Sequence, residues 1–168
     1  FIMMGWLLVT DPAQGHLPPT YHTLWLYVHI GLGKVFLGSV LVAVGIAGIV
    51  LMRGSGFAVR RFAGLPDDAR LDNLAFRFMV LGFIFETLML VAGAIWAQNA
   101  WGRYWAWDPL ETWAFITWLV LALYLHARIT FRLSPRLGAA AALAVFVLAF
   151  LTFFGVPFVS MAPHKGAV

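Results

Sequence analysis

Four long apolar stretches dominate the pattern of hydrophobic and polar positions along the chain. They run from about Thr23 to Met52, Leu74 to Ala97, Pro109 to Ile129 and Leu137 to Met161. Each exceeds the roughly 20 residues that an α-helix needs to cross a hydrocarbon core about 30 Å thick. The runs are continuous rather than alternating, which argues against a transmembrane β-barrel. The pattern therefore predicts an all-α integral membrane protein, a bundle of at least four transmembrane helices.

The composition agrees with a bilayer environment and excludes other classes. Hydrophobic residues make up 62% of the 168 positions and charged residues only 11%, against roughly 25% charged in a soluble domain. The 11 Lys and Arg form no run, so the basic pI is not the footprint of a nucleic-acid-binding domain. The absence of cysteine from the sequence excludes a disulfide framework and a thiolate metal site.

The start of the chain indicates a piece of a longer protein. It begins at Phe1 rather than Met, and its first apolar run is too short to span a bilayer. No basic segment of a secretory signal precedes that run. We expect residues 1–168 to form one transmembrane domain, in which Gly54–Asn73 is a loop between the first two spans, with or without a short helix of its own.

The distribution of basic residues predicts the topology. The loops after the first and third spans and their edges carry eight arginines: Arg53, Arg60, Arg61, Arg70, Arg77, Arg128, Arg132 and Arg136. The other side carries Arg103 and Lys165. Because positively charged loops stay in the cytoplasm, the Arg-rich loops are predicted to be cytoplasmic. Gln98–Asp108 and the C-terminus then lie outside an inner (plasma) membrane or a thylakoid-type membrane.

An aromatic segment marks the outer end of the third span. The thirteen residues WGRYWAWDPLETW, starting at Trp101, contain four Trp, one Tyr, one Asp and one Glu. Interfacial aromatic residues are common, but this packing into one loop favours an apolar platform for a flat hydrophobic ligand. Asp108 before Pro109 is typical of a helix N-cap followed by a first-turn proline, with Glu111 in the opening turn.

Histidines supply candidate ligands at the same depth. His29 lies near the outer end of the first span, and His164 lies just beyond the outer end of the fourth. Two imidazoles converging over an aromatic floor suit axial ligation of a haem iron, and two independent interfacial histidines are the alternative. His126 lies about 25 Å deeper along the third span, either as a ligand on a route from the cytoplasm or as a snorkelling residue. The remaining two, His16 and His22, are interpreted as solvated loop residues.

Two charged residues lie within the spans. Lys34 is in the first span and Glu86 is in the second. Charges in hydrocarbon are costly and indicate function by default. The alternative is a buried Lys34–Glu86 ion pair, which antiparallel neighbouring helices permit at these depths.

The segment from Trp96 to Arg128 resembles the tryptophan-rich WWD signature of the cytochrome c assembly family, the haem-handling membrane proteins of c-type cytochrome biogenesis. It reads WAQNAWGRYWAWDPLETW and continues through ITWL to YLHAR. The strongest resemblance is to the System II cytochrome c synthase branch. WLYVH, ending at His29, and FFGVPFVSMAPH, ending at His164, resemble the segments that carry that family's two external histidines. The similarity extends from about Leu24 to His164.

The resemblance implies a cofactor and its ligands. His29 and His164 would be the axial ligands to the iron of a non-covalently bound haem b beside the WWD loop, at about residues 96–113. His126 would be the intramembrane histidine on the path from the cytoplasm. The loop residues that would belong to the haem site are Trp101, Trp105, Trp107 and Asp108.

The resemblance also implies a function. Such a protein carries haem to the outer face and presents it for attachment to apocytochrome c, as part of a cytochrome c synthase (haem lyase). A second membrane subunit with a large outer domain would be its partner. Two alternatives remain open: a WWD-fold haem-binding subunit of a larger respiratory or assembly complex without synthase activity, and a transporter with an unrelated aromatic gate.

Overall fold

The computed structural model describes residues 21–53 and 60–156. Its elements are α2 (Leu24–Met52), α4 (Asp68–Trp101), α5 (Pro109–Phe131), α6 (Pro135–Phe150) and the π-helical turn η2 (Leu151–Gly155), which continues α6. These residues contain four helices long and apolar enough to cross a membrane, α6 and η2 counting as one, and no strand. The predicted all-α fold is confirmed.

The helix boundaries follow local signals in the sequence. α2 begins directly after Thr23, and α5 begins at Pro109, as predicted. The Asp108 side chain caps α5 by accepting a hydrogen bond of 2.9 Å from the backbone N–H of Glu111. Both helices therefore start where the hydropathy pattern and the capping residues place them.

α4 is longer than the hydropathy pattern predicts. It starts at Asp68 rather than at Leu74, so the loop predicted for Gly54–Asn73 was too long. Asp67 caps this helix by accepting a hydrogen bond of 2.8 Å from the backbone N–H of Arg70. The first turns of α4 are polar, so hydropathy does not mark them, whereas a capped helix forms there.

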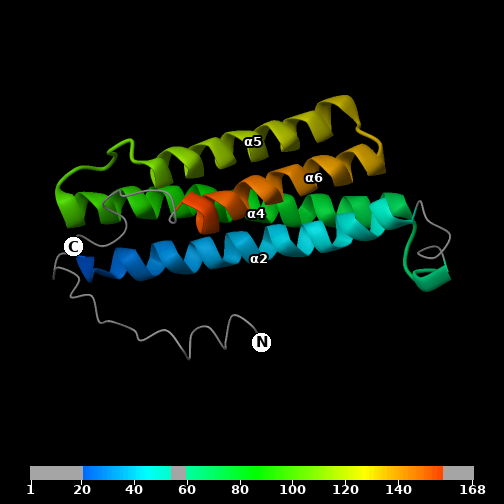
Figure 1. The fold of residues 1–168 in the computed structure, drawn as a ribbon, viewed down its shortest axis with the longest axis horizontal. Coiled ribbons are helices and arrows are strands. Elements are labelled where there is room, and N and C mark those ends of the chain that lie inside the picture. The colour runs from blue at the N-terminus through cyan, green and yellow to red at the C-terminus, as the bar shows by residue number, and fades with distance from the viewer. Residues whose placement is uncertain (1–20, 54–59, 157–168) are drawn as a thin grey trace.

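The four helices form an up-and-down bundle (Figure 1). α2 and α4 lie side by side and antiparallel, α6 packs on both, and α5 packs on α4 and α6. This topology brings the start of α2, the end of α4 and the start of α5 to one end. The Arg-rich connections gather at the opposite end, so the structure separates the two groups of loops that the charge distribution distinguishes.

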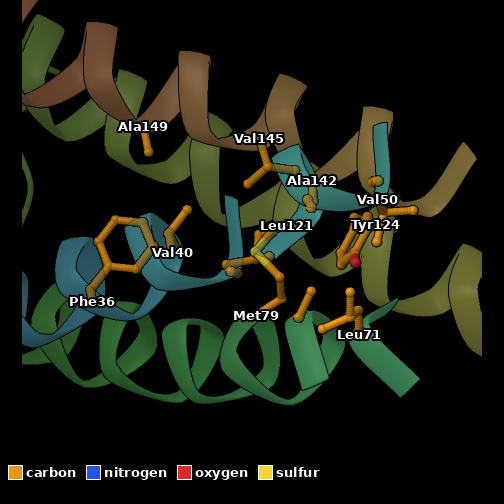
Figure 2. Packing of buried hydrophobic residues seen from close by; sticks show 14 residues of the cluster. Phe36, Val40, Val50, Leu71, Met79, Leu121, Tyr124, Ala142, Val145 and Ala149 are labelled. Carbon is orange, nitrogen blue, oxygen red and sulfur yellow. The ribbon is translucent and has the colours of Figure 1, made fainter. Parts of the chain in front are cut away.

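Apolar side chains from all four helices fill the interior, as Figure 2 shows for Phe36, Met79, Leu121 and Val145. Within a bilayer, helices associate through close packing, and small residues let their backbones approach. Gly82 is such a residue, because a Cβ there would lie 3.0 Å from a methyl carbon of Val40. The contact between α2 and α4 is therefore close, and it positions the site described next.

Arg53 organises the end of α2. It pairs with Asp68 at 2.9 Å and donates hydrogen bonds to three backbone carbonyls of the following segment, those of Phe62, Leu65 and Pro66. One guanidinium thus connects the end of α2 to three carbonyls of this segment and to the first turn of α4. The residues before α4 are held against the bundle by this side chain.

Candidate functional site

A cavity of about 250 Å³ lies at the end of the bundle opposite the Arg-rich connections. α2 contributes His29 to its wall, α4 contributes Met89 and Gly93, and the loop before α5 contributes Trp105. The first turn of α5 and the turn η2 complete it, and most of the lining is apolar. A concave apolar site with a few polar groups is what small-molecule and cofactor binding requires.

His29 is held firmly on the cavity wall. Its Nδ1 lies 2.9 Å from the carbonyl oxygen of Met89. A carbonyl only accepts hydrogen bonds, so Nδ1 carries the hydrogen, and in the neutral ring Nε2 carries the lone pair. The ring also stacks on Trp96, with centroids 6.2 Å apart and planes 13° apart. A histidine with one nitrogen bonded to a carbonyl is the usual arrangement of a metal-ligating imidazole.

Gly93 makes this position of His29 possible. A Cβ at residue 93 would lie 2.8 Å from Nδ1 and 2.9 Å from Cε1 of His29. Carbon atoms in proteins do not approach imidazole atoms so closely without displacement. The absence of a side chain on α4 therefore lets the imidazole lie directly on the helix backbone.

An aromatic cluster joins the start of α2 to the end of α4. Trp96 donates a hydrogen bond of 3.0 Å from Nε1 to the carbonyl oxygen of Tyr21. Trp101 packs edge-on against Trp96, at 5.0 Å between centroids, and against Tyr21, at 5.8 Å. Edge-to-face pairs of this kind stabilise a fixed arrangement, so this cluster supports His29 from behind.

The WWD loop covers the cavity with Trp105. The indole Nε1 of this residue is buried and has no hydrogen-bond partner in the part of the chain that the structure describes. Trp107 points outward with 71% of its surface exposed, and its φ of 59° lies in the left-handed region. A bulky side chain adopts that conformation only when its surroundings enforce it, at a cost of about 1–3 kcal/mol.

Two carboxylates clamp the loop onto α5. Asp108 is 7% exposed and caps the helix. Glu111 reaches back, and its Oε2 accepts a hydrogen bond of 2.7 Å from the backbone N–H of Ala106. The pair resembles a capping box in which the acidic residue at the third helical position satisfies the preceding backbone. The loop geometry around Trp105 thus depends on Glu111.

We predict that Glu111→Ala opens the loop whereas Glu111→Gln does not. Alanine removes the acceptor for the Ala106 N–H, at a cost of about 1.5–3 kcal/mol for a bond to a charged group, while the glutamine amide oxygen retains an acceptor. Tryptic cleavage after the exposed Arg103 reports opening. Cleavage in Glu111→Ala should be at least about tenfold faster than in the wild type. Equal rates in the wild type and both variants would contradict the clamp.

Comparison with known proteins identifies the family of the chain. The family described as Cytochrome C assembly protein matches residues 1–164. The chain belongs to the cytochrome c assembly family. The resemblance that the WWD segment suggests is therefore confirmed.

Curated relatives of the chain bear the name "Cytochrome c biogenesis protein CcsA". The protein from Gloeobacter violaceus is 42% identical over 135 residues, which are 76% of this chain and 39% of that relative. The protein from Helianthus annuus is 45% identical over 116 residues, which are 69% of this chain and 36% of the relative. The protein from Trichormus variabilis is 49% identical over 95 residues, 56% of this chain and 27% of the relative. The matched segment thus spans well under half the length of each of these relatives.

The structure brings together only some of the family site residues predicted from the sequence. His29 and Trp105 line the cavity, Trp101 supports it from behind, Asp108 caps α5, and Trp107 points outward. His164 and His16 lie outside the described residues. The predicted second ligand therefore remains a proposal.

His126 lies far from the cavity. It is exposed on α5, near the Arg-rich end, and its Nε2 is 3.5 Å from Oγ1 of Thr130. His22 is also exposed, at the start of the described chain. The structure thus keeps His126 apart from His29, as the calculated helical rise predicts.

The alternative of a Lys34–Glu86 ion pair was wrong. Lys34 is exposed, whereas Glu86 is fully buried and neither of its carboxyl oxygens has a hydrogen-bond partner in residues 21–53 and 60–156. The reason is rotational. Gly33 faces α4, and successive helical residues are turned by about 100° from one another, so the next side chain points away from that helix.

Sequence reasoning missed Met89, Gly93 and Trp96, which position His29. They recur on one face of α4 at spacings of three and four residues, and this periodicity is visible in the sequence. It does not show which neighbouring helix that face meets, so their role became visible only from the packing of α2 against α4.

Proposed function

We propose that this chain is a haem-binding membrane protein of c-type cytochrome biogenesis, which holds haem b non-covalently and presents it for attachment to apocytochrome c. The observation that carries this proposal is His29, an imidazole fixed by the Met89 carbonyl and by Trp96 on the wall of an apolar cavity. Family membership and the name of the curated relatives support it.

The residues around the cavity fit a haem group in two respects. The hydrogen bond to Met89 selects the His29 tautomer that can ligate iron through Nε2. The buried indole Nε1 of Trp105 has no acceptor among the described residues, and an acidic substituent of the ring would supply one. Buried polar atoms of this kind are rare unless a ligand or water satisfies them.

Each residue has a distinct part in the proposal. His29 would bind the iron and Trp105 would lie against the ring, with His164 proposed as the second axial ligand. His126 is proposed to act on the inner path. Haem would supply the vinyl groups to which the thiols of an apocytochrome c add, and the chain would contribute orientation and exclusion of water.

The orientation and the partners belong to the same proposal. The Arg-rich end is placed in the cytoplasm, and the cavity end is placed outside an inner or thylakoid-type membrane. This assignment is supported by the separation of the two groups of loops in the bundle. Apocytochrome c and a second membrane subunit with a large outer domain are the proposed partners, and the assembled complex is the proposed cytochrome c synthase.

The test is haem content. Wild-type protein purified from haem-replete cells should show a Soret band, and acid–acetone should extract the pigment. His29→Ala should lose most of the haem because it removes an axial ligand, and added imidazole should restore part of it by filling the vacated position. A colourless wild-type preparation would refute the proposal.

Two further histidine variants serve as controls for this experiment. His22→Ala changes an exposed residue at the same end of the bundle and should keep normal haem content. His126→Ala should lower the amount of haem bound while leaving its spectrum unchanged, because the residue is remote from His29. Normal haem content in His126→Ala would remove that residue from the proposed path.

A further inference from the structure

Glu86 is buried in a way that the proposed function does not explain. In residues 21–53 and 60–156 no other ionisable side chain is as deeply buried, since its exposed fraction is 0%. Neither carboxyl oxygen has a hydrogen-bond partner within those residues. It lies near the middle of α4, where an unpaired carboxylate is very costly. The carboxyl group must therefore be protonated, or be deprotonated only while a positive charge is present nearby.

The position of Glu86 is directly below the cavity. It shares a face of α4 with Met89 and Gly93, three and seven residues further on, and both line the cavity. At about 1.5 Å per residue, Glu86 lies about 5 Å below the first and about 10 Å below the second along the helix axis. Gly93 contacts the His29 ring, so the carboxyl group lies within electrostatic range of that imidazole.

Two buried hydroxyl groups lie at the same depth. Trp118 donates a hydrogen bond of 2.8 Å from Nε1 to Oγ1 of Thr87, which brings this part of α5 level with Glu86. The neighbouring Thr117 is fully buried, and its Oγ1 lies 2.9 Å from Oγ1 of Thr152. Thr152 also lines the cavity. Hydroxyl groups both donate and accept hydrogen bonds, so this pair places two such groups near this level, one of them on the cavity wall.

We propose that Glu86 is a proton-exchange site for the cavity: its carboxyl group releases a proton when positive charge is placed beside His29 and takes a proton up when that charge is removed. The inference rests on the proposed haem site, where the charge would change with the oxidation state of the iron. In a low-dielectric bundle, a carboxylate about 10 Å away stabilises the more positive state appreciably. Loss of one electron from the iron to a one-electron acceptor, such as the mediator of a redox titration, would then be accompanied by release of one proton from the Glu86 carboxyl group to water.

Other ionisable groups lie on the helices packed around Glu86. The ionisable groups that come nearest on each packed helix are His29 and Lys34 on α2, Asp72 and Arg77 on α4, and Glu111 and Tyr124 on α5. α6 carries one ionisable group, Arg136, in its first turn at the Arg-rich end, and η2 carries none. Lys34 and Arg77 are exposed. Glu111 lines the cavity, whereas Glu86 lies below it, and the experiment must separate the two carboxyl groups.

The experiment is a redox titration of the haem-loaded protein at a series of pH values. Deprotonated Glu86 favours the oxidised iron, so the wild-type midpoint potential should fall as pH rises through the titration of this group. The limiting slope is about 59 mV for each tenfold change in proton concentration. Glu86→Gln keeps the shape of the side chain but has no carboxyl proton to release. The midpoint potential of this variant should therefore lose the pH dependence that Glu86 contributes. The inference is overturned if Glu86→Gln retains the wild-type pH dependence.

Further variants make the result decisive. Glu111→Gln should keep the pH dependence that is attributed to Glu86. If Glu111→Gln loses this pH dependence, the exchanging proton belongs to Glu111 and the inference is overturned. Glu86→Leu should behave as Glu86→Gln does, and it replaces the glutamine variant if that variant does not accumulate.

Infrared difference spectra, wild type minus Glu86→Gln, should show the carbonyl stretch of a protonated carboxyl group even without haem. Absence of haem from the wild type would refute the proposed function and this coupling together, whereas haem with an unchanged pH dependence in Glu86→Gln would refute the coupling alone.

Discussion

Gly93→Ala is expected to weaken haem binding by about 10–100-fold, the range typical of losing a residue that orients a metal-ligating histidine. The added Cβ would lie 2.8 Å from Nδ1 of His29. The α4 backbone has little freedom to retreat, because Trp96 is tied to the Tyr21 carbonyl. The imidazole must therefore move and lose its hydrogen bond to Met89, although no ligand has been removed.

Haem titration of the purified protein, followed at the Soret band, measures this effect. Gly31→Ala is the matched control, because it adds the same methyl group on α2 where nothing lies within 4 Å, and it should bind haem as the wild type does. Comparison of thermal unfolding in the same detergent shows whether the bundle stays intact. Wild-type affinity in Gly93→Ala would mean that His29 does not ligate the iron from the position described.

Arg128→Ala is expected to destabilise the bundle by about 3–5 kcal/mol, the usual cost of removing one partner from a buried ion pair. Arg128 pairs with Asp72, and their side chains are only 12% and 8% exposed. It also donates a hydrogen bond of 3.0 Å to the Leu133 carbonyl and lies over the Phe76 ring. Gly138 of α6 leaves room for this pair, since a Cβ there would lie 2.8 Å from an oxygen of Asp72. The variant would leave Asp72 buried without its cation.

Equilibrium unfolding in detergent measures this loss. Arg70→Ala is the control, because its pair with Asp67 spans 3.9 Å and both side chains are largely exposed, so it should cost at most about 1 kcal/mol. Arg128→Met combined with Asp72→Leu should recover most of the stability, since a buried pair can be replaced by packed apolar residues. Equal stability of Arg128→Ala and Arg70→Ala would show that the pair does not hold the helices together.

The four spans could be predicted from hydropathy alone, because length and apolar composition are nearly sufficient to define a membrane helix. Capping chemistry located the start of α5 at Pro109, after Asp108. The start of α4 was missed because its first turns, from Asp68, are polar and carry no hydropathy signal. Local chemistry in the form of the Asp67 cap decides that boundary.

The sequence by itself also determined which residue types carry the candidate chemistry: the tryptophans of the WWD loop, His29 and the mid-span Glu86. Only the tertiary structure decided their partners. Helical periodicity fixes which side chains share a face, but not which neighbouring helix that face meets. The packing of α2 on α4 therefore places His29 on the backbone at Gly93 and turns Lys34 away from Glu86.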